Sequence, residues 1–272
     1  MDLNLLVVII LYKKDLEDSI AYQTLTKASA KSFLIYDNSP VPGKTPSVHN
    51  AKIHYVSDTS NQGLSHAYNY AADYAIKHGF DWIFISDQDT FFHDGIIREY
   101  DRAVKENPDI KLFLPHVRIA VDGKYMSPVK INRYFAKLSD SAPAGIINPG
   151  NYAIINSGMM INTAAFINAG GYNEKVWLDF ADFQFIERFA RKYDRAFVID
   201  LDCIQSFSDK EDTITQKIAR YKNFCSSVKH YQPIKASDRF WIFLVTLKRC
   251  ASLCAQSKKL TPISIFLKEY IL

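Results

Sequence analysis

The sequence of 272 residues has few cysteines and no apolar segment of membrane-spanning length at its start. Its four cysteines form no Cys-x-x-Cys pair, so neither a structural zinc site nor a disulfide framework is expected. The apolar run in the N-terminal MDLNLLVVIILYKKD covers about ten residues, too few to cross a bilayer. The same segment lacks the basic start and the small-residue cleavage site of a signal peptide. We therefore expect a cytoplasmic protein with reduced thiols.

The sequence also lacks a large net charge, since 33 basic and 29 acidic residues give a formal net charge of +4. Nothing in this balance calls for a nucleic-acid partner. The C-terminal segment 236–272 has six basic and two acidic residues, whereas residues 1–235 have 27 of each sign. The whole positive excess therefore lies in this tail.

Apolar residues are abundant, at 48%, which is enough to build one large α/β domain. Residues 5–12 are continuously apolar and rich in β-branched side chains, as in strands buried on both faces of a parallel sheet. Further elements are predicted along the chain: strands at 32–40, 52–58, 81–87 and 108–119, and helices at 15–31, within 61–80 and at about 94–106. This alternation predicts a mostly parallel sheet with helices on both faces.

Polar side chains follow three of the predicted strands. In sheets of this kind, ligands bind outside the carboxyl ends of the strands. We therefore expect a site formed by residues at these ends, namely Asp37, Asn38, Asp58, Asn61, Asp87 and Asp89. Residues 120–152 are rich in glycine and proline and are predicted to form a long irregular loop, a feature that is often functional in a compact domain.

Several spaced motifs are shared with a known family. They are Tyr12 at the end of the first strand, Asp37-Asn38-Ser39, Asn61-x-Gly63-x5-Asn69, Ser86-Asp87-Gln88-Asp89-Thr90, Asn156-Ser157-Gly158, Gly170-Gly171-Tyr172-Asn173-Glu174, and Leu178-Asp179-Phe180-Ala181-Asp182 with Arg188. Through them the sequence resembles the family 2 inverting glycosyltransferases of the GT-A fold, above all the bacterial polysaccharide branch of rhamnosyltransferases. The resemblance implies a Rossmann-like α/β domain, a nucleotide-diphosphate sugar donor and a glycan acceptor.

Asp87 and Asp89 are two positions apart, so their side chains point the same way on an extended segment. Like charges this close raise each other's pKa unless a cation lies between them. They could share one Mn²⁺ or Mg²⁺, which takes its other ligands from a diphosphate and water. The resemblance makes Asp89 the direct metal ligand, with Asp87 contacting the ribose or a metal-bound water. The alternative is a solvated turn at the end of a strand.

The resemblance places Tyr12, Asp37, Asn61 and Gly63 around the nucleotide. Asp37 would accept a hydrogen bond from the base of a uridine or thymidine nucleotide, with Tyr12 packing nearby. Asp-Asn-Ser-Pro also suits a plain Asx-turn. Asn61 and Gly63 would shape a loop whose free backbone N–H groups favour a phosphate, or would simply form an N-cap and a tight turn.

The resemblance makes Asp182 the expected general base, which takes the proton of the acceptor hydroxyl as that oxygen attacks the anomeric carbon. Its place at the start of a predicted helix also fits a structural role, since helix N-termini favour acidic residues. Asp179 is predicted to be an N-cap or an acceptor contact. Ser157 and Gly158 would line the donor and acceptor pocket.

The sequence departs from the family at two places. Ala181 stands where members commonly carry glutamate, a difference that the rhamnosyltransferase-like branch tolerates. Residues 202–208 contain no histidine, which the family often supplies there as a further metal ligand. The metal would then be held by Asp89, the diphosphate and water.

We expect a catalytic domain at 1–235, with a nucleotide-binding half at 1–115 and an acceptor half at 116–235, and then a helical tail at 236–272. The tail mixes aromatic and aliphatic residues with Lys and Arg, as do amphipathic helices on anionic membranes. It could also pack on the catalytic domain or across a homo-oligomer. The resemblance favours the inner face of the plasma membrane, because acceptors in this branch are usually carried on a polyprenyl diphosphate.

The branch favours dTDP-rhamnose as the donor and surface polysaccharide, such as O-antigen or capsule, as the product. UDP-galactose and UDP-glucose stay open as donors. Two hypotheses from other classes remain. A phosphohydrolase with an Asp-x-Asp-x-Thr loop would need threonine where Phe91 stands, and an inactive nucleotide-sugar binder would need no base at all.

Overall fold

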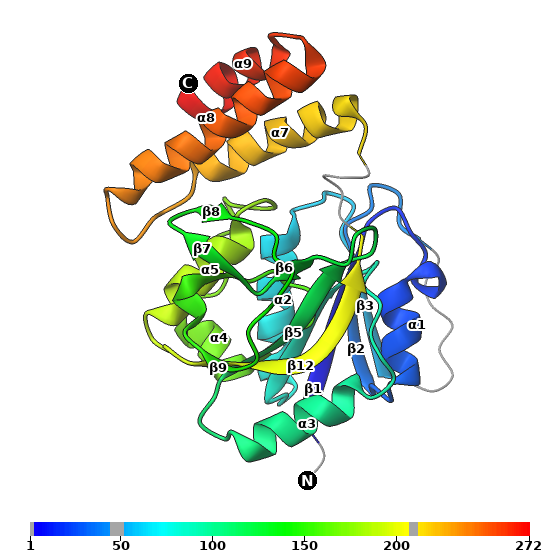
Figure 1. The fold of residues 1–272 in the computed structure, drawn as a ribbon. Coiled ribbons are helices and arrows are strands. Elements are labelled where there is room, and N and C mark those ends of the chain that lie inside the picture. The colour runs from blue at the N-terminus through cyan, green and yellow to red at the C-terminus, as the bar shows by residue number, and fades with distance from the viewer. Residues whose placement is uncertain (1–2, 44–51, 207–211) are drawn as a thin grey trace.

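The computed structural model describes residues 3–43, 52–206 and 212–272. Its centre is a mostly parallel sheet with helices on both faces, and the C-terminal helices lie together at one end of the molecule (Figure 1). The predicted α/β class with a mostly parallel sheet is confirmed.

The four strands predicted in the N-terminal third all form. They are parallel to one another in the spatial order β3-β2-β1-β4, with the bounds β1 (Leu5–Leu11), β2 (Ser32–Asp37), β3 (Lys52–Ser57) and β4 (Trp82–Asp87). β1 is buried along nearly its whole length, as its continuous apolar sequence predicts. Its carboxyl end therefore lies at the middle of the sheet edge, between the ends of β2 and β4.

Alternate residues of β1 point into two separate cores. Leu6, Val8 and Ile10 face a core covered by helices α2 (Leu64–Lys77), α4 (Thr163–Asn168) and α5 (Ala181–Ala190). The intervening residues face a second core covered by α1 (Ile20–Lys27) and α3 (Ile96–Glu106).

The helix predicted at 15–31 is divided in the structure. A 3₁₀ turn occupies Leu16–Asp18, and α1 begins only after Ser19, whose hydroxyl accepts a hydrogen bond from the backbone of Tyr22. This cap starts a new helix at Ile20, because it satisfies one of the first free N–H groups.

The second half of the sheet is mixed. β11 (Met159–Asn162) runs antiparallel between β4 and β5 (Leu112–Ile119), and β12 (Ala196–Gln205) is parallel to β5. At the periphery, β6 (Tyr125–Ser127) pairs antiparallel with β5, and β9 (Gly145–Ile147) pairs antiparallel with β12.

Segment 120–152 is less irregular than predicted. Besides β6 and β9 it contains β7 (Val129–Asn132), β8 (Phe135–Ala136), a 3₁₀ turn at Pro149–Asn151 and the start of β10 (Tyr152–Ala153), and a small sheet joins β10, β7 and β8. Strands of two to four residues are too short to give a hydrophobic period that can be recognised in the sequence.

The C-terminal helices form a unit with its own apolar core. It consists of α7 (Ile214–Lys229), α8 (Asp238–Ser257), α9 (Thr261–Ile265) and a π-helical segment, η3 (Phe266–Ile271). Tyr221, Phe224 and Val228 of α7 pack with Ile242 of α8 and with Phe266. The helical unit therefore begins with α7, inside the range that the sequence assigned to the acceptor half. Among the described helices, none combines the length and apolar character needed to cross a bilayer.

Candidate active site

The loop after β4 is held in place from two sides. On one side, Gln88 accepts a hydrogen bond from the backbone N–H of Tyr12 (3.0 Å), which ties the loop to the end of β1. On the other, the hydroxyl oxygen of Ser157 accepts from the backbone N–H of Asp87 (3.1 Å) and from the hydroxyl of Thr90 (2.9 Å). Ser157 and Gly158, predicted as pocket residues, thus lie directly behind the aspartate pair.

Gly158 is required by the close approach of β5. Its φ is +82°, and a Cβ atom there would lie 2.5 Å from Cγ of Pro115. Because L-residues avoid this φ and the proline ring leaves no room, only glycine lets β11 start beside the aspartate loop.

Asp87 and Asp89 share a polar partner that the sequence did not identify. Nε2 of Gln205, at the end of β12, donates to Oδ2 of Asp87 (2.8 Å) and lies 3.5 Å from Oδ1 of Asp89. Burial and the charge of Asp87 raise the pKa of Asp89, and the opposing effects of Lys14 and Gln205 do not cancel this rise. Like the predicted site residues, Gln205 is a polar side chain at the carboxyl end of a strand. The family resemblance points only to histidine as a further metal ligand in this segment, so Gln205 was not predicted from the sequence.

The residues present fit a hard divalent cation. The two carboxylates supply oxygen donors, and Oε1 of Gln205 is buried without a hydrogen-bond partner next to them. Within the described parts of the chain, no group of three His, Cys, Asp or Glu side chains is arranged around a metal position. Oxygen ligands suit Mn²⁺ and Mg²⁺. Asp89 and Asp87 are therefore the residues that would hold the cation.

Asp182 lies in the first turn of α5, after Phe180 in a left-handed conformation (φ +69°). Its Oδ1 accepts from the backbone N–H of Phe183 (2.8 Å). Burial, with the negative charges of Asp179 and Asp87, raises its pKa to about 7. An acid with this pKa exchanges its proton near neutral pH, as a general base must.

Asp87 and Asp182 belong to one site although they are far apart in the sequence. Two tyrosines of the core, Tyr68 and Tyr172, have their pKa raised by burial and by the charges of both carboxylates. The ring centroids of these tyrosines lie 5.3 Å apart. The fold thus brings Asp87, one of the two predicted metal ligands, and the predicted base close to the same pair of aromatic side chains.

Asp179 has a partner from the C-terminal helices. Nη2 of Arg220, on α7, lies 3.5 Å from Oδ1 of Asp179, while Oδ2 is buried without a partner. Neither the spacing nor the composition around Arg220 distinguishes it from other basic residues of a helix surface. Its contact with Asp179 could therefore not be predicted from the sequence.

Asp37 forms the Asx-turn that the sequence allowed. It is fully buried, with Oδ1 accepting from the Ser39 backbone (2.9 Å) and Oδ2 from the Tyr55 hydroxyl (2.6 Å) and the Gly43 backbone (3.0 Å). Burial would raise its pKa, but these hydrogen bonds prevail and lower it. Tyr12, with 43% of its surface exposed, lies beside this turn at the end of β1.

The loop at Asn61 and Gly63 is more fully bonded than expected. The backbone N–H groups of Asn61 and Gln62 donate to Asp58, and that of Leu64 donates to the carbonyl of Trp177. Gly63 has φ +91°, and a Cβ atom there would lie 2.6 Å from the same carbonyl. These three N–H groups therefore already have partners, and the loop is a tight turn packed on Trp177.

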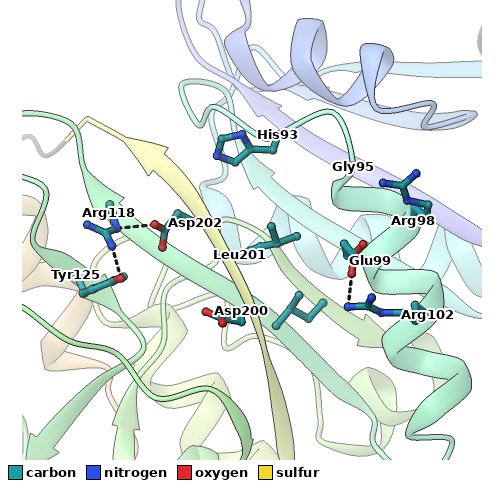
Figure 2. A pocket seen from close by; sticks show the side chains of 11 residues that line it. His93, Gly95, Arg98, Glu99, Arg102, Arg118, Tyr125, Asp200, Leu201 and Asp202 are labelled. Atoms are coloured by element: carbon teal, nitrogen blue, oxygen red, sulfur yellow. Dashed lines mark hydrogen bonds and ion pairs between the residues drawn. The ribbon is translucent and has the colours of Figure 1, made fainter.

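A separate cavity of about 670 Å³ lies between α3, β12 and the β5–β6 hairpin (Figure 2). Figure 2 shows Arg118 paired with Asp202 and hydrogen-bonded to Tyr125. The ion pair joins Nε of Arg118 to Oδ2 of Asp202 at 2.7 Å. None of the residues predicted for the site lines it. Its lining residues are His93, Gly95, Arg98, Glu99, Arg102, Arg118, Tyr125, Ile199, Asp200, Leu201 and Asp202.

Comparison of the whole chain with known proteins identifies its fold. No family model and no curated protein matches the sequence. Residues 1–349 of TarS from S. aureus are similar in structure, with TM-score 0.56, 12% identity, and coverage of 93% of this chain and 72% of that one. GalNAc-T7, solved with UDP, GalNAc and Mn²⁺, has TM-score 0.58, 10% identity, and coverage of 88% and 53%.

The mannosyltransferase PcManGT from Pyrobaculum calidifontis, solved with GDP-Man and Mn²⁺, has TM-score 0.55 and 14% identity. The match covers 97% of this chain and 79% of that one. At these identities the likeness bears on the fold and not on the reaction. The chain has the GT-A fold, an α/β fold that these glycosyltransferases share.

Proposed function

We propose that the protein is an inverting glycosyltransferase that moves a sugar from a nucleotide-diphosphate donor to a glycan acceptor. The observation that supports this proposal is that Gln205 contacts both Asp87 and Asp89 at the carboxyl edge of a GT-A sheet, while the charge of Asp87 also acts on the buried Asp182. Two carboxylates suited to a cation and a third with a pKa of about 7 are the groups that such a transfer needs.

Asp89 and Asp87 hold the cation in this proposal. When bound, the cation stabilises the negative charge that develops on the departing diphosphate. Ser157 and Gln88 keep the two carboxylates in place, since Ser157 accepts a hydrogen bond from the backbone of Asp87 and Gln88, between the two carboxylates, accepts one from the backbone of Tyr12. Ser157 and Gly158 act as support for the donor pocket.

Asp182 acts as the base. One of its oxygens is fixed by the Phe183 backbone, which leaves the other free to accept the proton of the acceptor hydroxyl. The hydroxyl oxygen forms a bond to the anomeric carbon while the bond from that carbon to the diphosphate oxygen breaks. Direct displacement inverts the configuration of the sugar. Asp179 contacts the acceptor, with Arg220 holding its other oxygen.

The nucleotide lies at the ends of β1, β2 and β3, over Tyr12, Asp37, Asn61 and Gly63. The exposed ring of Tyr12 supports this placement, because it offers a flat apolar surface beside the strand ends. Asp37 fixes the turn that borders the base. It accepts from the base itself only when the Tyr55 hydroxyl or the Gly43 N–H gives way, because both already bond to Oδ2.

The donor we propose is dTDP-rhamnose, with UDP-galactose or UDP-glucose as the alternative, and the acceptor is a glycan on a polyprenyl diphosphate in surface polysaccharide synthesis. A carrier of this kind places the enzyme at the inner face of the plasma membrane. Basic and exposed apolar side chains of α8, α9 and η3 support this location.

A thermal-shift panel of UDP-, dTDP- and GDP-sugars, each with and without Mn²⁺, tests the proposal. Binding to the folded state alone raises the melting temperature. We expect one nucleotide class to stabilise the protein, and more strongly with Mn²⁺. If no nucleotide sugar in the panel shifts the melting temperature, the proposed function is wrong.

A further inference from the structure

The end of β12 is fastened to the aspartate loop by backbone hydrogen bonds. The N–H of Phe91 donates to the carbonyl of Ile204 (2.8 Å), and the N–H of Ile204 donates to the carbonyl of Phe91 (3.1 Å). Gln205 follows directly and is 8% exposed. The backbone hydrogen bonds between Phe91 and Ile204 therefore hold the buried side chain of Gln205 beside Asp87 and Asp89.

The amide of Gln205 is satisfied at only one end. Its NH₂ group serves both carboxylates, at 2.8 Å from Asp87 and 3.5 Å from Asp89, while its carbonyl oxygen is buried without a partner. A buried acceptor without a hydrogen bond costs free energy, so a native structure needs a reason to keep one. The NH₂ group also carries only part of a positive charge, which leaves the repulsion between two carboxylates incompletely balanced.

We propose that Gln205 is an oxygen ligand of the divalent cation that Asp87 and Asp89 hold, and that its amide turns over when the cation binds. Without the cation, the NH₂ group holds the two carboxylates together. With the cation present, a half-turn about the last side-chain bond exchanges the amide nitrogen and oxygen, which have nearly the same size. Oε1 then faces the cation and gains the partner it lacks.

This assignment deepens the proposed function and rests on it for the diphosphate that completes the cation's ligands. It also sets the chemistry of the ion. Two carboxylates and an amide carbonyl form an all-oxygen set, which suits Mg²⁺ and Mn²⁺ better than ions that prefer nitrogen ligands. Gln205→His supplies a nitrogen donor and is expected to shift the preference towards Co²⁺ and Zn²⁺.

Binding of Mn²⁺ to the full-length protein, followed by the loss of the free-ion EPR signal, tests the assignment. Titrations are run without nucleotide and with UDP, dTDP or GDP. Gln205→Met is close in size to the native residue but lacks both donor and acceptor, and we expect it to weaken Mn²⁺ binding by about tenfold or more. Gln256→Met, on the exposed surface of α8, is the matched control and is expected to bind as the wild type does.

Gln205→Glu gives a second, independent result. It keeps an oxygen ligand but loses the NH₂ group, so we expect Mn²⁺ to bind at least as tightly as in the wild type. Three carboxylates without a donor repel one another, so the same variant is expected to melt at a lower temperature without Mn²⁺ and to gain more from adding it. This pattern separates a metal ligand from a residue that only supports the fold.

The assignment is overturned if Gln205→Met binds Mn²⁺ as the wild type does, or if Gln205→Glu binds it more weakly. It is also overturned if the wild type binds a nucleotide diphosphate with no effect of Mn²⁺, since the NH₂ group would then stand in for a metal permanently. That last result leaves the proposed function intact. Conversely, failure to bind any nucleotide contradicts the proposed function. The nucleotide-free Mn²⁺ titrations still test whether Gln205 is a metal ligand in that case.

Discussion

Nη2 of Arg220, on α7, lies 3.5 Å from Oδ1 of Asp179, three residues before the proposed base, and so joins the C-terminal helices to the proposed catalytic centre. Asp179 is one of the charges that raise the pKa of Asp182. Arg220 opposes that charge, and Asp179 has a second oxygen that is buried without a partner. The C-terminal unit is therefore part of the site's electrostatics.

Arg220→Gln is expected to move the pH dependence of transfer upwards. Without the guanidinium, Asp179 acts on Asp182 unopposed, so Asp182 holds its proton to higher pH. The rise of kcat/KM with pH is then expected to shift to higher pH relative to the wild type. Arg102→Gln is the control, because Arg102 pairs with Glu99 on α3 and contacts neither Asp179 nor Asp182. An unchanged profile in Arg220→Gln contradicts the link.

Wild-type transfer is expected to increase with pH through a pKa of about 7, since Asp182 acts only when deprotonated. Asp182→Asn removes the base and is expected to lower turnover by roughly 10²- to 10⁴-fold, with nucleotide binding kept. Asp194→Asn, at an exposed position beyond α5, serves as the control and is expected to leave turnover unchanged. If Asp182→Asn turns over as fast as the wild type, another group takes the proton of the acceptor hydroxyl.

The same carboxyl predicts a stability effect of defined sign. Its folded pKa of about 7 lies above its ordinary value of 3.8, so between pH 4 and pH 7 the folded chain binds more protons than the unfolded chain. The contribution of this group to stability is therefore full at low pH and is lost as pH rises through about 7. Asp182→Asn, which cannot ionise, is expected to raise the melting temperature at pH 8 relative to wild type and to change it little at pH 4.

Gly158→Ala is expected to destabilise the protein more than Gly123→Ala does. Both glycines have positive φ, +82° and +68°, so both substitutions carry the backbone cost of about 1–2 kcal/mol. Only Gly158 would also place its Cβ against Pro115, whereas Gly123 has open space. We expect an extra cost of about 1–3 kcal/mol for Gly158→Ala, measured by urea unfolding. Equal losses of unfolding free energy in the two variants would mean that β5 moves away from the new Cβ atom at no cost.

The features of the fold that follow from local pattern were predictable from the sequence. The buried run of β4 ends at Asp87 and Asp89 follows two residues later, so the local pattern alone placed both carboxylates at the sheet edge. The helix that carries Asp182 was predicted because residues 177–194 resemble a helix entered through acidic residues, and α5 begins within that range, at Ala181. The GT-A fold expected from the motifs is the fold observed.

Contacts between distant segments could not be read in the same way. Gln205 meets Asp89 across 116 positions, and Arg220 meets Asp179 across 41, and neither distance leaves a periodic signal. The buried side chains of α7 pack on α8. The sequence of α7 alone is compatible with packing either on the sheet or on the C-terminal helices. The hydrogen bond of the Leu64 N–H depends likewise on Trp177, more than a hundred residues away.

The C-terminal helices are expected to bind anionic membranes through a stripe on α9 and η3. Leu260, Ile263, Leu267 and Ile271 are spaced by three or four residues and are 43–75% exposed, with Lys258 and Lys259 at the start of the stripe. The double substitution Ile263→Glu and Leu267→Glu is expected to abolish flotation with vesicles containing phosphatidylglycerol, because it removes apolar contact and adds charge that the lipid repels. Ile76→Glu, at an apolar site on α2 that is 51% exposed, controls for loss of an exposed side chain and is expected to float as the wild type does. Equal flotation of all three proteins, or of wild type with uncharged phosphatidylcholine vesicles alone, contradicts the proposed membrane surface, since its two parts act together only on an anionic leaflet.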